Sequence, residues 1–208
     1  SDCMTLKFAA NLSMMFTEFA FEDRFAAAAE CGFRGVEFLF PYEWPAEAIA
    51  GWLADNQLQQ VLFNLSPGDW ASEERGIASL PGRETEFAES VEQAISYAHV
   101  LKCPRLHAMA GLKDSAFSDA QHLATYVDNI ALAAKRCEEE GLSLLIEPIN
   151  SQDIPGYFLN DFDQATDIIE ELREECPALQ LQFDIYHCAK IHGDVVRRMT
   201  NAERMTAH

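Results

Sequence analysis

The amino-acid sequence predicts an α/β protein built from six consecutive strand–helix units. Short runs rich in β-branched and aromatic residues alternate with longer segments of helical periodicity, and this order distinguishes α/β proteins from other classes. The 208 residues, 49% of them hydrophobic, can bury one sizeable core. A doubly wound sheet should offer a glycine-rich phosphate-binding turn after an early strand, and this sequence contains none. An eight-unit barrel typically needs roughly 250 residues, so the chain looks short by about two units. Periodicity alone leaves both folds open, and we expect one domain over residues 1–208.

The first unit combines a strand at Leu6–Asn11 with a helix at Phe21–Cys31. Apolar residues such as Phe21 and Phe25 recur at helical spacing in this second segment. Gly32 follows it directly, and glycine is the residue that most often ends a helix. The first unit is therefore expected to end at this glycine.

The next two strands enclose a helix and are followed by a long connection. Gly35–Phe40 reads as a strand, Pro45–Asn56 as a helix opened by proline, and Gln60–Asn64 as a third strand. The segment 65–83 then shows no regular pattern. Loops of this length are uncommon in compact domains and often form lids or binding loops.

The fourth unit is the clearest. A helix at Glu84–Leu101 leads to a strand at Arg105–Met109, and a second helix covers Ser118–Glu140. Ser118 is a suitable N-cap, and Gly141 stops the helix at its other end.

The last two strands both end in a carboxylate. Ser143–Glu147 is apolar until its final residue, and Leu179–Asp184 follows a helix at Phe162–Glu175. A further helical stretch lies around Asp194–Arg204. The sequence therefore predicts six strand–helix units.

Charge and cysteine usage restrict the function classes. The formal net charge of −19 opposes binding to nucleic acid or to anionic lipid, which needs clustered Lys and Arg. No apolar run approaches the roughly 20 residues of a membrane helix, and no signal-peptide pattern opens the chain. The six cysteines are scattered without a CxxC pair, as expected for reduced thiols. We expect a cytoplasmic protein whose partner is a small molecule.

Polar residues stand at or near the carboxyl ends of all six predicted strands, where parallel α/β folds place their active sites. They are Asn11, Glu37, Asn64, His107, Glu147 and Asp184, with His187 just beyond the last. A carboxylate at the end of a buried strand is costly unless it is paired or binds a metal. Glu147 and Asp184 would suit Mg²⁺ or Mn²⁺ through their oxygens, with a helix cap or a salt bridge as the structural alternative for each.

Histidines and arginines supply the remaining candidates. His187 could be a metal ligand, a proton shuttle or a donor to substrate oxygen, and His107 is a weaker candidate for the same roles. Arg75 and Arg83, in the long loop, could bind a substrate carboxylate, although for either one taken singly an ordinary solvated charge is the simpler interpretation. The histidines of the helical segments are expected on solvated surfaces; they are His99, His122 and His192.

Several strings, found in this order, resemble the hydroxypyruvate isomerase family within the xylose-isomerase-like TIM barrels. They are FAANLSMMF, GVEFLFPY, ERGIASLPGRE, LLIEPIN and FDIYH. The resemblance implies a TIM (β/α)8 barrel. It also implies a divalent-metal site in which Glu147 and Asp184 are ligands, His187 lies near the substrate, and Glu147 transfers protons. Family members continue through two more units, which bring another ligand and a second acid/base. The sequence ends before them, so we expect a C-terminally incomplete barrel.

By similarity, the reaction would interconvert hydroxypyruvate and tartronate semialdehyde through an enediolate, without a nucleotide cofactor. Its substrate would be a small anionic hydroxy-keto acid, with Arg75, Arg83, His107 and Asn64 as further substrate-binding candidates. A 2-oxo-tetronate isomerase or a ketose 3-epimerase would share this chemistry. A DNA-repair endonuclease on the same barrel would need more histidine ligands and a basic groove. The alternative of another class is an inactive fragment that forms a homo-oligomer through the open edges of its sheet.

Overall fold

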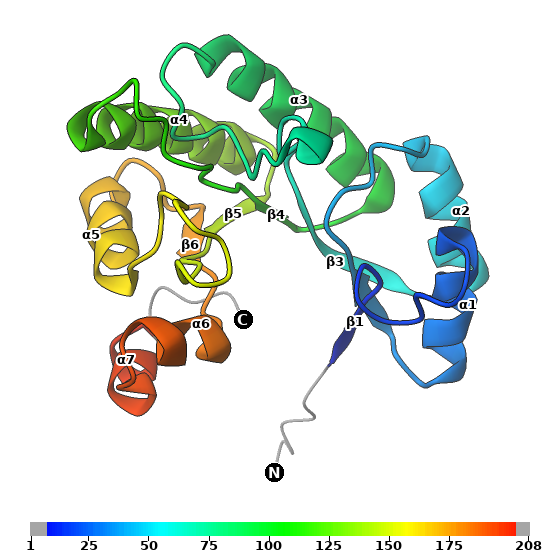
Figure 1. The fold of residues 1–208 in the computed structure, drawn as a ribbon. Coiled ribbons are helices and arrows are strands. Elements are labelled where there is room, and N and C mark those ends of the chain that lie inside the picture. The colour runs from blue at the N-terminus through cyan, green and yellow to red at the C-terminus, as the bar shows by residue number, and fades with distance from the viewer. Residues whose placement is uncertain (1–7, 203–208) are drawn as a thin grey trace.

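The computed structural model describes residues 8–202 as one parallel sheet flanked by helices (Figure 1). The strands are β1 (Ala9–Asn11), β2 (Gly35–Glu37), β3 (Gln59–Asn64), β4 (Arg105–His107), β5 (Ser143–Ile146) and β6 (Leu179–Leu181). The helices are α1 (Phe21–Glu30), α2 (Ala46–Asp55), η1 (Trp70–Ser72, a 3-10 turn), α3 (Glu84–Leu101), α4 (Asp119–Glu139), α5 (Phe162–Leu172), α6 (Ile185–Ile191) and α7 (Val195–Ala202). The alternation of six strand–helix units is therefore confirmed.

The sheet has the order β1-β2-β3-β4-β5-β6, and every adjacent pair is parallel. Sequential order with parallel pairing is the arrangement of a barrel wall, whereas a doubly wound sheet reverses its order partway. The register shifts between Val36 and Glu37, so that Glu37 pairs with Leu62 and Val61 is skipped. Such irregularities re-aim side chains, and this one lies at the carboxyl end of β2.

Helices α1 to α5 follow the sheet in chain order around its outer side, as Figure 1 shows. The core between these layers is fully buried and aliphatic at its centre, with Ile49, Leu106, Ile130 and Leu144 at 0% exposure. An aromatic cluster seals α1 and α2 against β2, where the Phe21 ring stacks on Trp44 at 4.2 Å between centroids. The packing of helices on the sheet fixes the positions of the six strand ends relative to one another. None of the helices within residues 8–202 is long and apolar enough to cross a bilayer.

Local sequence rules explain the helix ends. Ser118 forms a capping box with Gln121 at the start of α4, as its position predicted. Asp161 caps α5 by accepting from the backbone N–H groups of Asp163 and Gln164. Gly32 and Gly141 follow the last residues of α1 and α4 at φ of +89° and +71°, so both predicted stops are confirmed.

Four predicted strands extend past the carboxyl ends of the observed ones, and the first predicted strand begins before Ala9, where β1 starts. β2, β4, β5 and β6 stop one to three residues early because the chain turns away from the ladder toward its next helix. After β2, for example, the Leu39 N–H donates to the Ser13 hydroxyl at 2.9 Å instead of to a strand. The predicted Phe162–Glu175 helix likewise ends at Leu172. Leu6 and Lys7 of the first predicted strand, and residues 203–204 of the last predicted helix, lie outside the described residues.

The long connection 65–83 is ordered by backbone contacts to the segment after β4. Gly76 and Ala110 form an isolated bridge, and the Ser79 hydroxyl donates to the Ala110 carbonyl at 2.7 Å. The Asn129 side chain, on α4, donates to the Ala78 carbonyl at 2.9 Å. The predicted binding loop is therefore held firmly against β4 and α4.

Replacement of Gly76 by alanine is expected to destabilise the protein by at least about 2 kcal/mol. Gly76 has a φ of +107°, and a Cβ atom there would overlap the Met109 carbonyl group. Urea unfolding measures the change. Gly82→Ala is the matched control because Gly82 also has a positive φ, of +88°, but a Cβ atom added there would meet no other atom within 4 Å. Equal costs for the two substitutions would contradict the close approach at Gly76.

Candidate active site

The parallel sheet brings the predicted polar residues to one edge. Asn11, Glu37, Asn64 and His107 are the last residues of β1 to β4. Glu147 directly follows β5, and Asp184 lies three residues beyond the end of β6. Because these positions follow adjacent parallel strands, they form one mouth rather than separate sites.

Glu147 is the most perturbed carboxylate of this mouth. Its side chain is only 12% exposed. Burial, with smaller contributions from the negative charges of Asp184 and Glu37, raises the pKa of Glu147 to about 8. Burial also raises the pKa of Glu37. A carboxylic acid whose pKa lies close to neutral pH can both accept and return a proton, which is the property of a general acid/base.

Asp184 and His187 complete a compact group with Glu147. Asp184 caps α6, with its Oδ1 accepting from the His187 N–H at 3.2 Å. The His187 Nε2 lies 3.7 Å from the Glu147 Oε1. One ligand atom from each of the three residues lies within 4.8 Å of the other two. Two carboxylates this close, one of them buried, are a donor set that fits a hard divalent cation.

A second acidic group, at the start of α5, is less suited to a cation. Asp161, Asp163 and His192 also lie within 4.8 Å of one another. Arg198 already forms an ion pair with Asp163, and the His192 Nε2 accepts from the Phe162 N–H at 3.2 Å. Because these partners occupy its ligand atoms, the first group is the better candidate for a metal site.

His107 and Asn64 form a buried polar pair at the ends of β3 and β4. The His107 Nδ1 lies 3.2 Å from the Asn64 Oδ1, an arrangement in which the ring N–H donates to the amide oxygen. Burial lowers the pKa of His107 to about 4, so the ring is neutral. Its Nε2 is buried and has no hydrogen-bond partner among residues 8–202. That nitrogen is available to accept a hydrogen bond from a ligand.

The two arginines of the long loop differ in what they contact. Arg83 makes ion pairs with Glu74 and with both oxygens of Glu86, so its guanidinium is already neutralised. Arg75 stacks on the Trp70 ring, with its Cζ atom 3.7 Å from the centroid. Within the described part of the chain, no carboxylate lies within ion-pair distance of Arg75. Of the two, Arg75 is the one whose charge is free for an anion.

Two residues of this region were not singled out by the sequence. Asn150 is 2% exposed and bonds to the His187 ring. Tyr157 is fully buried, and its hydroxyl accepts from the Ala110 N–H at 2.7 Å; burial raises its pKa, and the charge of Glu147 adds to this effect. Asn150 stands three residues after Glu147 in LLIEPIN, which is the only sequence feature that could have pointed to it.

The expectation that the helix histidines are solvated is wrong for His122. This residue is fully buried, and its Nδ1 lies 2.8 Å from the Ser79 carbonyl oxygen. The long loop packs on this face of α4, which the helical pattern could not show. The expectation is also wrong for His192, whose side chain is only 11% exposed, whereas His99 is half exposed and pairs with Glu140.

The stability of the metal-free protein is expected to fall as pH rises from about 6.5 to about 8, above the range in which the buried, neutral His107 gives the opposite slope. The pKa of Glu147 is about 8 in the folded protein against an ordinary value of 4.5, so the folded form retains a proton that the unfolded chain releases. Raising pH therefore favours unfolding, with a slope approaching about 1.4 kcal/mol per pH unit from this group. Urea unfolding in the presence of a chelator measures the slope. Glu147→Gln should flatten the dependence of stability on pH. An unchanged slope in that variant would show that other groups cause it.

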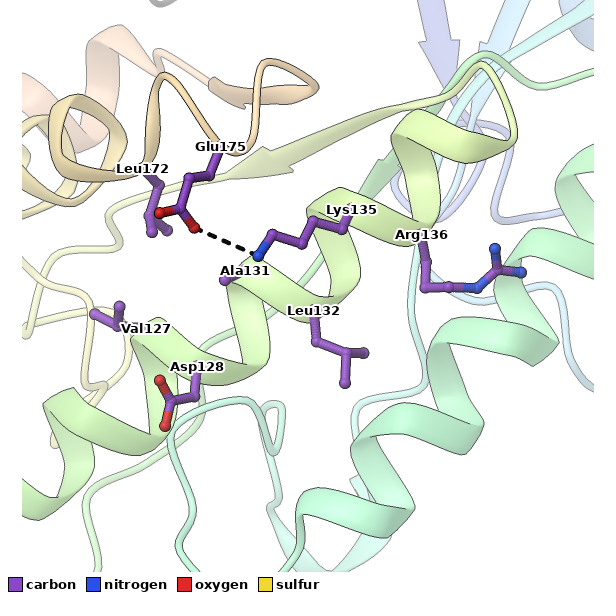
Figure 2. A pocket seen from close by; sticks show the side chains of 8 residues that line it. All are labelled: Val127, Asp128, Ala131, Leu132, Lys135, Arg136, Leu172 and Glu175. Atoms are coloured by element: carbon purple, nitrogen blue, oxygen red, sulfur yellow. Dashed lines mark hydrogen bonds and ion pairs between the residues drawn. The ribbon is translucent and has the colours of Figure 1, made fainter.

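A hollow on the outer surface lies far from this mouth. It is formed by α4 and the end of α5, and apolar side chains and the ion pair between Lys135 and Glu175 line it (Figure 2). The hollow contains no histidine and no buried carboxylate. The chemistry is therefore assigned to the strand ends.

Comparisons with known proteins agree with the fold. The profile of the family described as Xylose isomerase-like TIM barrel matches residues 25–208. The 2-oxo-tetronate isomerase of Cupriavidus necator is 50% identical over 193 residues, which cover 93% of this chain and 74% of that protein. The hydroxypyruvate isomerase of Escherichia coli is 46% identical over 195 residues, which cover 94% and 75%. A crystal structure described as AP endonuclease, family 2, from Brucella melitensis aligns with a TM-score of 0.94 at 41% identity, covering 98% of this chain and 78% of that one.

Proposed function

Because the chain belongs to the family of xylose isomerase-like TIM barrels, we propose that it is an isomerase that interconverts hydroxypyruvate and tartronate semialdehyde. The observation that carries this proposal is the buried Glu147, whose pKa is raised to about 8, beside Asp184 and His187 at the strand ends. Moving a proton between adjacent carbons needs a base of this kind and no redox cofactor.

Glu147 and Asp184 are the residues that would hold a divalent metal. Carboxylates within 4.8 Å of each other repel unless a cation or a proton lies between them, and this fits the group. A bound Mg²⁺ or Mn²⁺ would polarise the substrate carbonyl and favour the ionised form of the neighbouring carboxylate.

The chain's own side chains account for the proton transfer. The Glu147 carboxylate takes a proton from the hydroxymethyl carbon of hydroxypyruvate, which leaves an enediolate. The Glu147 carboxyl, whose proton exchanges with solvent while the enediolate persists, delivers a proton to the neighbouring carbon. The hydroxyl proton moves between the two oxygens, and the aldehyde results. His187, 3.7 Å from Glu147, lies where it can contact the substrate oxygens. The buried walls on this side exclude water and strengthen these interactions.

Arg75 and His107 are proposed to bind the rest of the substrate. Arg75, stacked on Trp70 and free of carboxylate partners within residues 8–202, would pair with the substrate carboxylate. The His107 Nε2 would accept a hydrogen bond from a substrate hydroxyl, which would remove the free-energy cost of a buried acceptor without a partner. Asn64 fixes the orientation of His107, whereas the two ion pairs of Arg83 make it the weakest of the predicted substrate ligands.

A 2-oxo-tetronate isomerase is the second candidate. The observation in its favour is the 50% identity with the Cupriavidus necator protein of that name, slightly above the 46% identity with the hydroxypyruvate isomerase. Both reactions would use the same base and the same metal. The net charge of −19 opposes an endonuclease function, because DNA binding needs phosphate-neutralising cations.

Comparing kcat/KM for hydroxypyruvate, a 2-oxo-tetronate and a free ketose, with Mg²⁺ or Mn²⁺ present, tests the proposal. We expect hydroxypyruvate to be preferred by at least about tenfold, a difference that one pocket contact can supply. Preference for the 2-oxo-tetronate would establish the second candidate instead. Preference for the ketose, which lacks a carboxylate, would overturn both candidates and the role of Arg75.

A further inference from the structure

The two ring nitrogens of His187 face different residues. On one side its Nε2 faces Glu147 at 3.7 Å. On the other side its Nδ1 faces Asn150, from the segment that follows β5. The side chains of His187 and Glu147 are 13% and 12% exposed, so protein groups rather than bulk water decide which ring nitrogen carries a proton.

Asn150 directs two donors at the same nitrogen. Its backbone N–H donates to the His187 Nδ1 at 3.2 Å, and its side-chain Nδ2 lies 2.8 Å from that atom. The orientation of the amide is fixed independently, because its Oδ1 accepts from the N–H groups of Gln152 at 3.1 Å and Asp153 at 3.0 Å. The amide therefore cannot turn its oxygen toward the ring without losing both of these bonds.

A nitrogen that accepts from two donors must present its lone pair. The neutral imidazole has one proton, so that proton lies on Nε2 and faces Glu147. A ring with Nε2–H offers a donor there rather than a lone pair for a cation. His187 would then contact a substrate oxygen, and Glu147 and Asp184 would contact the metal.

We propose that Asn150 is a positioning residue that fixes the Nε2–H tautomer of His187 and thereby makes this histidine a hydrogen-bond donor to the substrate. The catalytic consequence rests on the proposed isomerase function. The tautomer itself does not, since it follows from contacts within the metal-free and substrate-free protein.

Nitrogen-15 NMR of the histidine rings in the metal-free protein, at mildly alkaline pH, tests this assignment. Comparison with His187→Gln identifies the resonances of His187. We expect the parent protein to show a protonated Nε2 and an unprotonated Nδ1. Asn150→Asp places a charged carboxylate oxygen where Nδ2 was, whereas the backbone N–H of residue 150 stays at the longer distance of 3.2 Å. Because a charged acceptor makes the stronger hydrogen bond, we expect Nδ1 to gain a proton in that variant and kcat to fall by roughly 10- to 100-fold.

Asn160→Asp is the matched control. Asn160 lies in the same connection, and its Nδ2 donates to the Tyr157 carbonyl at 3.0 Å, with no hydrogen bond to His187. It should leave the His187 tautomer unchanged. A proton on Nδ1 in the parent protein, or an unchanged tautomer in a folded Asn150→Asp protein, would overturn the proposal. If that variant does not fold, the parent spectrum still decides. Absence of turnover in a parent protein with Nε2–H would overturn the isomerase function and leave the assignment of Asn150 supported.

Discussion

Replacement of Glu147 by glutamine is expected to lower kcat for hydroxypyruvate isomerisation by about 10³-fold, within the range that a positioned acid/base contributes. Glutamine keeps the size of the side chain but cannot accept a proton. The neutral amide also removes the repulsion among Glu147, Asp184 and Glu37 that raises the pKa of Glu147. We therefore expect the metal-free variant to be at least as stable as the parent protein at pH 8, while its turnover is lost. Steady-state kinetics and urea unfolding of the same preparations measure the two effects.

Glu174→Gln is the control for this substitution, because Glu174 is an exposed carboxylate just beyond α5 and lies outside the mouth. It should leave kcat unchanged. A Glu147→Gln protein that retains more than about a tenth of the parent kcat would remove Glu147 from the role of base.

Replacement of Asp184 by asparagine is expected to weaken Mn²⁺ binding by at least the roughly 10- to 100-fold that loss of an outer partner of a metal site costs. The substitution removes one of two negative charges from the group while keeping its shape. Asparagine caps helices as well as aspartate does, so the bond to the His187 N–H and the start of α6 should survive. Titration of Mn²⁺ into the metal-free protein, followed by paramagnetic resonance, measures affinity without relying on turnover.

Asp161→Asn is the matched control for the metal site. Asp161 is also a helix cap, at the start of α5, and belongs to the second acidic group with Asp163 and His192. Its replacement should leave Mn²⁺ affinity within about twofold of the parent value, because Asp161 belongs to a different group of residues and independent sites affect each other only slightly. If Asp161→Asn weakened binding more than Asp184→Asn did, the metal site would lie at α5 instead.

The fold could be predicted from the sequence because its repeating pattern is local. The strands are short, mostly apolar runs, and several helices carry a start or stop residue, such as Ser118 or Gly141. The rule that parallel strands end at one edge then brought Glu147, Asp184 and His187 together without any knowledge of their distances. Strand lengths were less predictable, since pairing ends where the neighbouring chain turns away.

The partners of the site residues could not be predicted, because they depend on how long connections fold back. Nothing local shows that Asn150 would turn its amide to His187, or that Glu74 and Glu86 would neutralise Arg83. The burial of His122 has the same cause, since the loop carbonyl that it contacts is 43 residues distant in the sequence. Contacts between segments far apart in sequence are what the structure adds.

In the proposed reaction, Glu147 moves a carbon-bound proton of the substrate. Incubating hydroxypyruvate with the parent protein in deuterium oxide, and following the carbon-bound hydrogens by proton NMR over many turnovers, tests it directly. We expect solvent deuterium to accumulate at the carbons of recovered substrate and product, and Glu147→Gln to abolish this exchange. Isomerisation that proceeds with full retention of the substrate's own hydrogen would indicate direct hydride transfer and contradict the role given to Glu147.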